Sequence, residues 1–256
     1  MNLIVCIKEV PDTESRIQVR DGQIVEEGLQ YVLNPYDEYA LEEALRWQEN
    51  LGGQVKLLCL GPERARESIL KGLAMGADEA YHVVAETGQG DAYVTAQVLA
   101  AAIARLGDYD AIFCGKQAVD DDNAAVGVML AELLDLPHVA VITRLEITPD
   151  GKSARAEREI EGGKEVVETP LPAVFTAQKG LNEPRYPSFK GIRMAARKPM
   201  TLWQLADLGL GDVQPGVELV AFMTPPARAA GRVIPGEPAE AAKEVARLLR
   251  AEAKVI

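Results

Sequence analysis

The sequence of 256 residues is long enough for one large domain, or for a domain with a smaller extension, and its core needs no disulfide or metal. Asp and Glu outnumber Lys and Arg by 39 to 27, a formal net charge of −12, so most of the surface would repel nucleic acid. Hydrophobic residues make up 48% and charged residues 26%, which excludes wholesale disorder.

The apolar runs are too short for a membrane or a secretory signal. The longest uncharged one, residues 92–104, falls short of a membrane span, and the apolar start of the chain covers only residues 3–7. Cys6, Cys59 and Cys114 each lie in an apolar run and are expected to be buried free thiols in a reducing compartment. A cytoplasmic protein without membrane insertion is expected.

Short apolar runs alternate with amphipathic stretches through the first half of the chain. The pattern predicts strands at 3–10, 54–60, 81–85 and 111–114. It predicts helices that begin near Asn34, follow Gly61-Pro62, and cover 91–106 and 123–134. In the first helix Asn34 is the expected N-cap, with Glu38, Glu42, Glu43 and Arg46 on the exposed side. This alternation predicts an α/β fold with a doubly wound, mostly parallel sheet.

The pattern changes after Pro137. Strands are expected at 138–148, 153–161 and 165–169, joined by two hairpin turns, and at 173–177. An irregular segment, 178–199, precedes a tail with one more strand and a final helix over 237–253. The sequence therefore predicts an α/β domain over 1–215, which includes the antiparallel hairpins of 138–177, and a C-terminal arm with a helix over 216–256.

The loop that follows the fourth predicted strand is the first candidate site. Gly115 lies between a buried strand and a helix, where doubly wound sheets bind ligands. Free amides at the start of the helix would attract a phosphate, and Lys116 would add charge. The acidic run 120–122 opposes an anion and could instead bind Mg²⁺ or act as a solvated cap. These residues alone do not decide between a phosphate site, a Mg²⁺ site and a solvated helix cap.

Two further strand ends are ambiguous, and catalytic motifs are not found. The segment 34–37 is either a plain helix cap or part of the same site. Leu60 and the two residues after it, just past a strand, are equally ambiguous. The sequence has no G-x-S-x-G motif, its cysteines are isolated, and its two histidines, His82 and His138, are expected to be structural. Neither a metal site nor catalytic residues are predicted.

The segment 185–198 is basic in an acidic protein. It carries five Lys and Arg residues, no acidic residue, and the rings of Tyr186 and Phe189. Such a segment could dock on an acidic partner, with its charges steering approach and its rings as anchors. A solvated loop would have the same composition.

In this order, the segments resemble the beta (small) subunit of electron-transfer flavoprotein. The match includes residues 5–8, Asn34-Pro35-Tyr36-Asp37-Glu38, residues 60–62 and 73–78, and Gly115-Lys116-Gln117-Ala118-Val119-Asp120-Asp121-Asp122. It continues through residues 157–163, 171–174 and 181–186 to Pro225-Pro226 with Arg228 and Gly231. The combination covers nearly the whole chain.

The resemblance implies a Rossmann-like fold and a heterodimer with an alpha subunit that holds most of one FAD. The beta subunit of this family binds a structural AMP. The positions that match the AMP contacts are Cys6, Asn34, Pro35, Tyr36, Asp37, Leu60, Gly115, Lys116, Gln117, Ala118, Val119, Asp120, Asp121, Asp122, Asn123, Ala124, Ala125 and Val126. Bifurcating relatives hold a second FAD there and have a loop like Asp-Gly-Asp-Thr. The run Asp-Asp-Asp-Asn at 120–123 resembles the AMP-binding type.

The resemblance also implies surfaces for partners. The segment 181–194 matches the loop that docks on acyl-CoA dehydrogenases, with Phe189 in place of the usual leucine anchor. The docking residues are Arg185, Tyr186, Phe189, Ile192 and Met194. Glu159 matches a carboxylate that the family uses across the interface, although an exposed strand residue would look the same. The C-terminal arm is expected to pack on the alpha subunit.

The expected function is electron transfer, with no catalytic residues in this chain. Electrons would pass from flavin dehydrogenases, through the FAD, to a membrane quinone oxidoreductase. The alternatives are a stand-alone adenine-nucleotide-binding regulatory protein, and a nucleotide hydrolase or transferase that would need a base which the sequence does not show.

Overall fold

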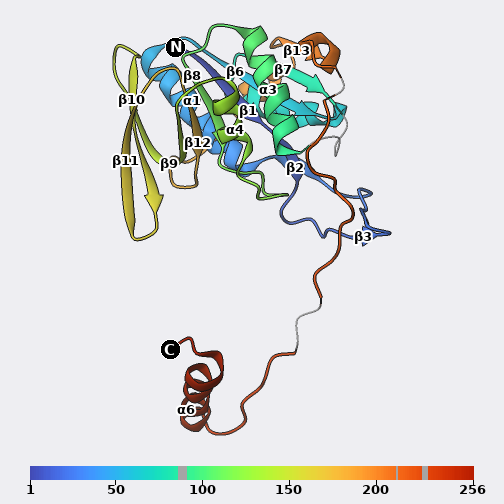
Figure 1. Ribbon diagram of the computed structural model, residues 1–256, viewed down its shortest axis with the longest axis vertical. Coiled ribbons are helices and arrows are strands. Elements are labelled where there is room, and N and C mark those ends of the chain that lie inside the picture. Colours follow the sequence, from blue (N-terminus) through green and yellow to red (C-terminus); the bar gives the residue numbers. More distant parts are fainter. Residues whose placement is uncertain (86–90, 212, 227–229) are drawn as a thin grey trace. The chain divides into compact units, whose positions relative to one another are not determined.

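The computed structural model describes residues 1–85, 91–211, 213–226 and 230–256 (Figure 1). Arg228, one of the residues in the resemblance, lies outside this part. The chain divides into two compact units, Met1–Ala221 and Phe222–Ile256. The first unit contains the sheet and its helices. The second contains one helix, α6 (Pro238–Leu248), with Pro238 in its first turn as expected, and a π-helical end (Leu249–Ala253).

A nine-stranded sheet lies at the centre of the first unit, in the order β11-β10-β9-β12-β8-β1-β6-β7-β13. The seven strands from β9 to β13 in this order are parallel, whereas β10 and β11 are antiparallel additions at one edge. The bounds are β1 (Asn2–Ile7), β6 (Gln54–Gly61), β7 (Glu79–Val84), β8 (Ala111–Gly115), β9 (His138–Ile147), β10 (Ser153–Ile160), β11 (Gly163–Pro170), β12 (Ala173–Ala177) and β13 (Met200–Trp203).

Helices cover both faces of this sheet. On one face α1 (Pro35–Leu51) and α2 (Arg66–Met75) pack against the odd-numbered side chains of β1, such as Leu3 and Val5. On the other face α3 (Ala92–Leu106) and α4 (Val126–Leu133) pack against Ile4 and its neighbours. Successive strand side chains point to opposite faces, so buried strands are apolar at every position. The arrangement confirms the predicted α/β, doubly wound, mostly parallel sheet.

Several small elements lie outside the central sheet and its helices. Two short antiparallel pairs precede α1, namely β2 (Glu9–Pro11) with β5 (Tyr31–Leu33) and β3 (Val19–Arg20) with β4 (Gln23–Ile24). The expected strand 3–10 is therefore split at Lys8. Two 3₁₀ turns, η1 (Glu63–Ala65) and η2 (Leu205–Leu208), follow β6 and β13.

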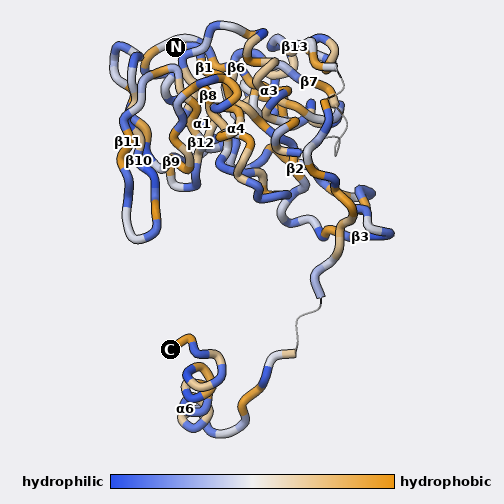
Figure 2. The backbone as a smooth tube through the Cα atoms, viewed as in Figure 1, coloured by the Kyte–Doolittle hydropathy of each residue, from blue (hydrophilic) through white to orange (hydrophobic). Residues whose placement is uncertain are grey.

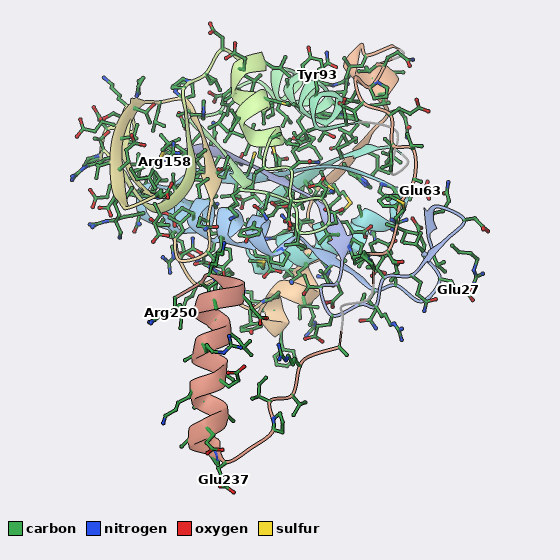
Figure 3. The ribbon with its side chains drawn as sticks, turned by 60° about the horizontal axis from the view of Figure 1, so that its bottom comes forward. Glu27, Glu63, Tyr93, Arg158, Glu237 and Arg250 are labelled. Carbon is green, nitrogen blue, oxygen red and sulfur yellow. The ribbon has the colours of Figure 1, made fainter. Side chains whose placement is uncertain are left out.

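The hairpin β10–β11 confirms the predicted turn after residue 160. Ile160 and Gly163 are paired across a two-residue connection. The tip of this hairpin is mainly hydrophilic in Figure 2. Arg158, labelled in Figure 3, lies on the hairpin with its Nε 3.6 Å from Glu165.

Helix α4 begins three residues later than predicted. The expected start was Asn123, but the helix begins at Val126. Asp122 and Ala124 have φ values of 52° and 51°, in the left-handed region, which a right-handed helix cannot include. The residues 123–125 therefore belong to the loop, and the loop is longer than the sequence pattern indicated.

The exposed side of α1 was also predicted wrongly. Glu42 and Glu43 are buried, with 3% and 5% of their surface exposed. The residues that cover them, Asn182 and Arg185, lie about 140 positions away in the sequence, so helical periodicity alone could not place these carboxylates. Asn34 occupies the N-cap position as expected, but its side chain caps no amide of the helix.

Three further elements differ from expectation in the last quarter of the chain. The irregular segment 178–199 contains a short helix, α5 (Phe189–Ala195), whose N-cap Ser188 accepts a hydrogen bond from Gly191 N. Strand β13 was not predicted, because an edge strand with one neighbour needs only a weak apolar pattern. The strand expected in the tail is not found in the described residues 213–226 and 230–236, where Val220 and Met223 are exposed.

Along the described residues, no helix has the length and apolar character that a membrane crossing requires.

Candidate functional site

The strand order reverses between β1 and β8. The chain passes from β1 outward to β6 and β7, and then returns to place β8 on the other side of β1. Ligands of doubly wound sheets bind at such a switch point, beyond the carboxyl ends of the strands. A cavity of about 660 Å³ lies there, in the size range of small-molecule sites, lined by the ends of β1 and β8 and by the N-terminal part of α3.

Most of the residues predicted from the resemblance line this cavity. They come from four separate segments: Cys6, Asn34, Asp37, Leu60, Gly115, Lys116, Gln117, Ala118, Asp121, Asn123, Ala124, Ala125 and Val126. The remaining five are not among the lining residues: Pro35, Tyr36, Val119, Asp120 and Asp122. The fold thus brings the three ambiguous strand ends together at one cavity, and their contact with a nucleotide stays a prediction.

Asp37 links the strand ends behind the cavity. Its carboxylate accepts hydrogen bonds from Lys8 N at 2.7 Å, from Asn34 Nδ2 at 2.9 Å and from Gly115 N at 3.0 Å. Burial raises the pKa of this carboxyl to about 7, and the three hydrogen bonds act in the opposite direction. Asn34 in turn donates to Gln117 O and accepts from Val119 N.

The acidic run 120–122 is held by other parts of the chain. Lys8 Nζ lies 2.8 Å from Asp120 and 3.3 Å from Asp121, and Gln117 Nε2 donates to Asp122. These contacts draw the carboxylates toward a cation and an amide, which reduces their repulsion of an anion in the cavity. In the part of the chain that the structure describes, no three His, Cys, Asp or Glu side chains gather as a metal site, so the Mg²⁺ interpretation gains no support.

The two helices that begin at the cavity differ at their N-termini. Asp91 caps α3, where its carboxylate accepts a hydrogen bond from Val94 N at 2.9 Å. Ala125, at the N-cap position of α4, provides no side-chain acceptor. The first amides of a helix have no carbonyl partner within it and carry partial positive charge. The start of α4 and Lys116 therefore fit a phosphate.

Sequence reasoning missed one side of the cavity. Asp91, Thr95 and Leu99 of α3 line it, together with Leu205 and residues 211 and 213–215. Asp91 had a detectable signal, because a capping aspartate directly precedes an apolar helix that follows a strand. The segment 213–215 had none, and it is placed by hydrogen bonds from Gly216 N and Val217 N to the Asp91 carboxylate.

The three cysteines and His82 are buried, whereas His138 at the start of β9 is exposed. All three cysteines are buried free thiols, as predicted. Cys6 and Cys114 line the cavity, and a hydrogen bond from the Cys6 thiol to Cys114, together with burial, raises the pKa of Cys6 well above its usual value, so its thiol stays protonated. His82 is buried and bonded to Gly61 O at 3.0 Å, as expected of a structural histidine.

The basic segment 185–198 is tied to the body of the unit at both ends. Arg185 Nε donates to Glu42 at 2.8 Å and its Nη1 to Glu49 at 2.5 Å. Lys198 Nζ donates to the carbonyls of Leu73, Gly76 and Ala77 at the end of α2. Two of the five cations are therefore used within the chain and hold the segment in place.

Apolar side chains are exposed between these two attachments. Tyr186 and Phe189 are 96% and 91% exposed, and Ile192 and Met194 are exposed as well. Lys190 and Arg193 lie among them on α5. Clustered exposed apolar residues with a charged rim are typical of protein–protein contacts. Glu159 is exposed near the tip of the β10–β11 hairpin, opposite Lys164.

The fold and this cavity define a doubly wound α/β protein with a ligand-sized site at its switch point. The family model described as "Electron transfer flavoprotein domain" matches residues 21–208. The chain is 43% identical to the electron transfer flavoprotein subunit beta of Bacillus subtilis over 260 residues, which covers all of both chains. It is 40% identical to the protein of the same name from Thermoanaerobacterium thermosaccharolyticum, over 97% of this chain and 98% of that protein.

A further relative has a different name. The chain is 38% identical to "Caffeyl-CoA reductase-Etf complex subunit CarD" of Acetobacterium woodii, over 92% of each chain. These matches extend over nearly the whole length of this chain and of its relatives. The chain belongs to the family of electron transfer flavoprotein beta subunits. Its relatives are named as subunits of electron carriers.

Proposed function

We propose that the chain is the small subunit of a heterodimeric electron carrier and that its cavity holds AMP. The observation that carries the proposal is the cavity at the β1–β8 switch point, to which four distant segments contribute residues. The uncapped start of α4 and Lys116 would bind the phosphate, and the apolar side chains of α3 would contact the adenosine. In this assignment AMP is structural.

The redox chemistry would belong to an FAD held mainly by the large (alpha) subunit, which supplies reversible electron transfer when bound. This chain would provide a rigid platform for it. The C-terminal unit, with the exposed apolar residues Val245 on α6 and Leu249 in the π-helical end, suits packing on that subunit. Glu159, exposed on the hairpin, would contact its mobile flavin domain.

The exposed apolar residues of 186–194 would dock on flavin dehydrogenases such as acyl-CoA dehydrogenases. Phe189 would be the anchor, with Tyr186, Ile192 and Met194 beside it, and the cations of α5 would steer approach to an acidic rim. The engaged guanidinium of Arg185 would hold this surface in position. The electrons would then pass to a membrane quinone oxidoreductase.

The deciding experiment is to co-express the chain with an electron transfer flavoprotein alpha subunit from the same organism, purify the complex, denature it and weigh the released ligands by mass spectrometry. We expect a yellow heterodimer that releases one FAD and one AMP. Two flavins per heterodimer would reject the AMP assignment in favour of a bifurcating type. A colourless, nucleotide-free monomer that never pairs with a flavin-bearing chain would reject the whole proposal.

A further inference from the structure

Asp37 lies where three segments of the cavity wall meet, and each of its partners is a donor. Lys8 N belongs to the residue after β1, Asn34 Nδ2 to the start of α1, and Gly115 N to the end of β8. Oδ2 accepts from Lys8, and Oδ1 accepts from the other two. An ionised carboxylate accepts these three hydrogen bonds most strongly, because protonation of either oxygen removes the negative charge and one lone pair.

Asn34 transmits this arrangement to the loop 115–126. Because Asp37 can only accept, Asn34 must turn its Nδ2 toward it, which leaves Oδ1 for Val119 N at 3.2 Å. The second hydrogen of Nδ2 is donated to Gln117 O at 2.9 Å. A reversed amide would place donors against Val119 N and an acceptor against two acceptors. The negative charge on Asp37 therefore strengthens the hydrogen bond that, together with Gln117 O and Val119 N, orients the Asn34 amide toward the loop.

We propose that ionised Asp37 is a positioning residue of the nucleotide site: through Gly115 N and the Asn34 amide it holds the loop 115–126 in the conformation that binds the phosphate. This inference rests on the proposed function of the cavity. Asp37 lines the cavity, but both carboxylate oxygens already accept hydrogen bonds from protein donors, so we assign its effect on the ligand to the loop that it holds. A free carboxylate aimed at a phosphate would repel it.

Among the titratable groups that face one another here, Asp37 is the one whose protonation changes near pH 7. Lys8, directly after β1, is the facing cation and favours the ionised form. Cys6 of β1 and Cys59 of β6 have raised pKa values, so both thiols are neutral near pH 7. Burial raises the pKa of Asp37 to about 7, so the carboxylate is ionised above this pH and becomes protonated below it. The arrangement of the loop should be lost in the same range.

The test measures AMP binding to the nucleotide-free complex of this chain with the large subunit, at pH 8.0 and pH 6.0, by isothermal titration calorimetry. With a pKa of about 7, the ionised fraction of Asp37 falls on the order of tenfold between these pH values, and AMP affinity should fall by about the same factor. The AMP phosphate itself titrates near pH 6 and adds a smaller change to every variant.

Asp37→Asn separates the titration of Asp37 from the titration of the AMP phosphate, because the asparagine amide has the shape of the carboxyl but no charge. We expect this variant to bind AMP at pH 8.0 as weakly as the wild type does at pH 6.0, and to keep only the change due to the phosphate. Asp135→Asn is the matched control. Asp135 is exposed and has a left-handed φ of 53°, which asparagine tolerates, and this variant should follow the wild type. Equal pH dependence in Asp37→Asn and wild type would overturn the inference.

Amide hydrogen exchange of the wild type provides a test that does not depend on whether Asp37→Asn folds. After correction for intrinsic rates, Gly115 and Val119 should lose protection between pH 8.0 and pH 6.0, while amides in the middle of α3 should not. Unchanged protection of Gly115 and Val119 would refute the positioning role. If the wild type does not bind AMP even at pH 8.0, the proposed function fails, and the exchange data still decide whether Asp37 positions the loop.

Discussion

Replacement of Gly115 by alanine tests the close approach on which the site depends. A Cβ at this position would overlap the Asp37 carboxylate and lie 2.8 Å from both the carbonyl carbon and the Cβ of Tyr36. The carbonyl carbon and Cβ of Tyr36 are fixed by the backbone of the first turn of α1, and Ala40 and Leu41 in the next turn are fully buried in the core. The neighbouring atoms cannot move aside without shifting the helix, so Gly115→Ala must separate β8 from α1.

The cost follows from two contributions. Inserting a methyl group into a packed site costs about 1–3 kcal/mol. The hydrogen bond from Gly115 N to the Asp37 carboxylate would be stretched, and bonds to charged groups contribute about 1.5–3 kcal/mol. We therefore expect a loss of about 2.5–6 kcal/mol. For a domain of this size, each kcal/mol lowers the melting temperature by roughly 2–4 °C, so the decrease should be roughly 5–24 °C.

The assay is thermal unfolding followed by circular dichroism at fixed protein concentration, together with the AMP content of the purified complex. Gly163→Ala is the matched control, because nothing lies within 4 Å of the Cβ that it would add and its φ is not in the left-handed region. The control should melt within about 2 °C of the wild type. If Gly115→Ala melts with the control and retains AMP, the close packing of β8 against α1 does not constrain the site and the reasoning is wrong.

Two predictions concern the segment between the attachments at Arg185 and Lys198. Arg185→Met removes the guanidinium and leaves the buried Glu42 with the backbone amide of residue 185 and the half-exposed Arg46 as partners. It should cost about 1–3 kcal/mol in urea unfolding and speed amide exchange in α5. Unchanged exchange would show that this ion pair does not hold the segment. Phe189→Ala should leave stability and FAD content unchanged, because the ring is 91% exposed, but slow reduction by a cognate dehydrogenase; unaltered rates would remove its anchor role.

Local sequence signals were sufficient for the parallel sheet and most of its helices. The strands of 111–115 and 173–177 are apolar at every position except Thr176, because both of their faces are covered, and this pattern is visible without a structure. Asp91 before an apolar helix and Pro238 in the first turn of α6 were recognisable for the same reason, since helix ends depend on residues next to them in the chain.

Contacts between distant residues decided what the sequence left open. The burial of Glu42 depends on Arg185, and the wall formed by 213–215 depends on Asp91, so neither had a local pattern. The segments at Cys6, Asn34 and Gly115 were each ambiguous alone, and only the return of β8 beside β1 brings their ends to one cavity. Short-range preferences determine the elements, whereas the site is made where strand order reverses, which is a property of the folded sheet alone.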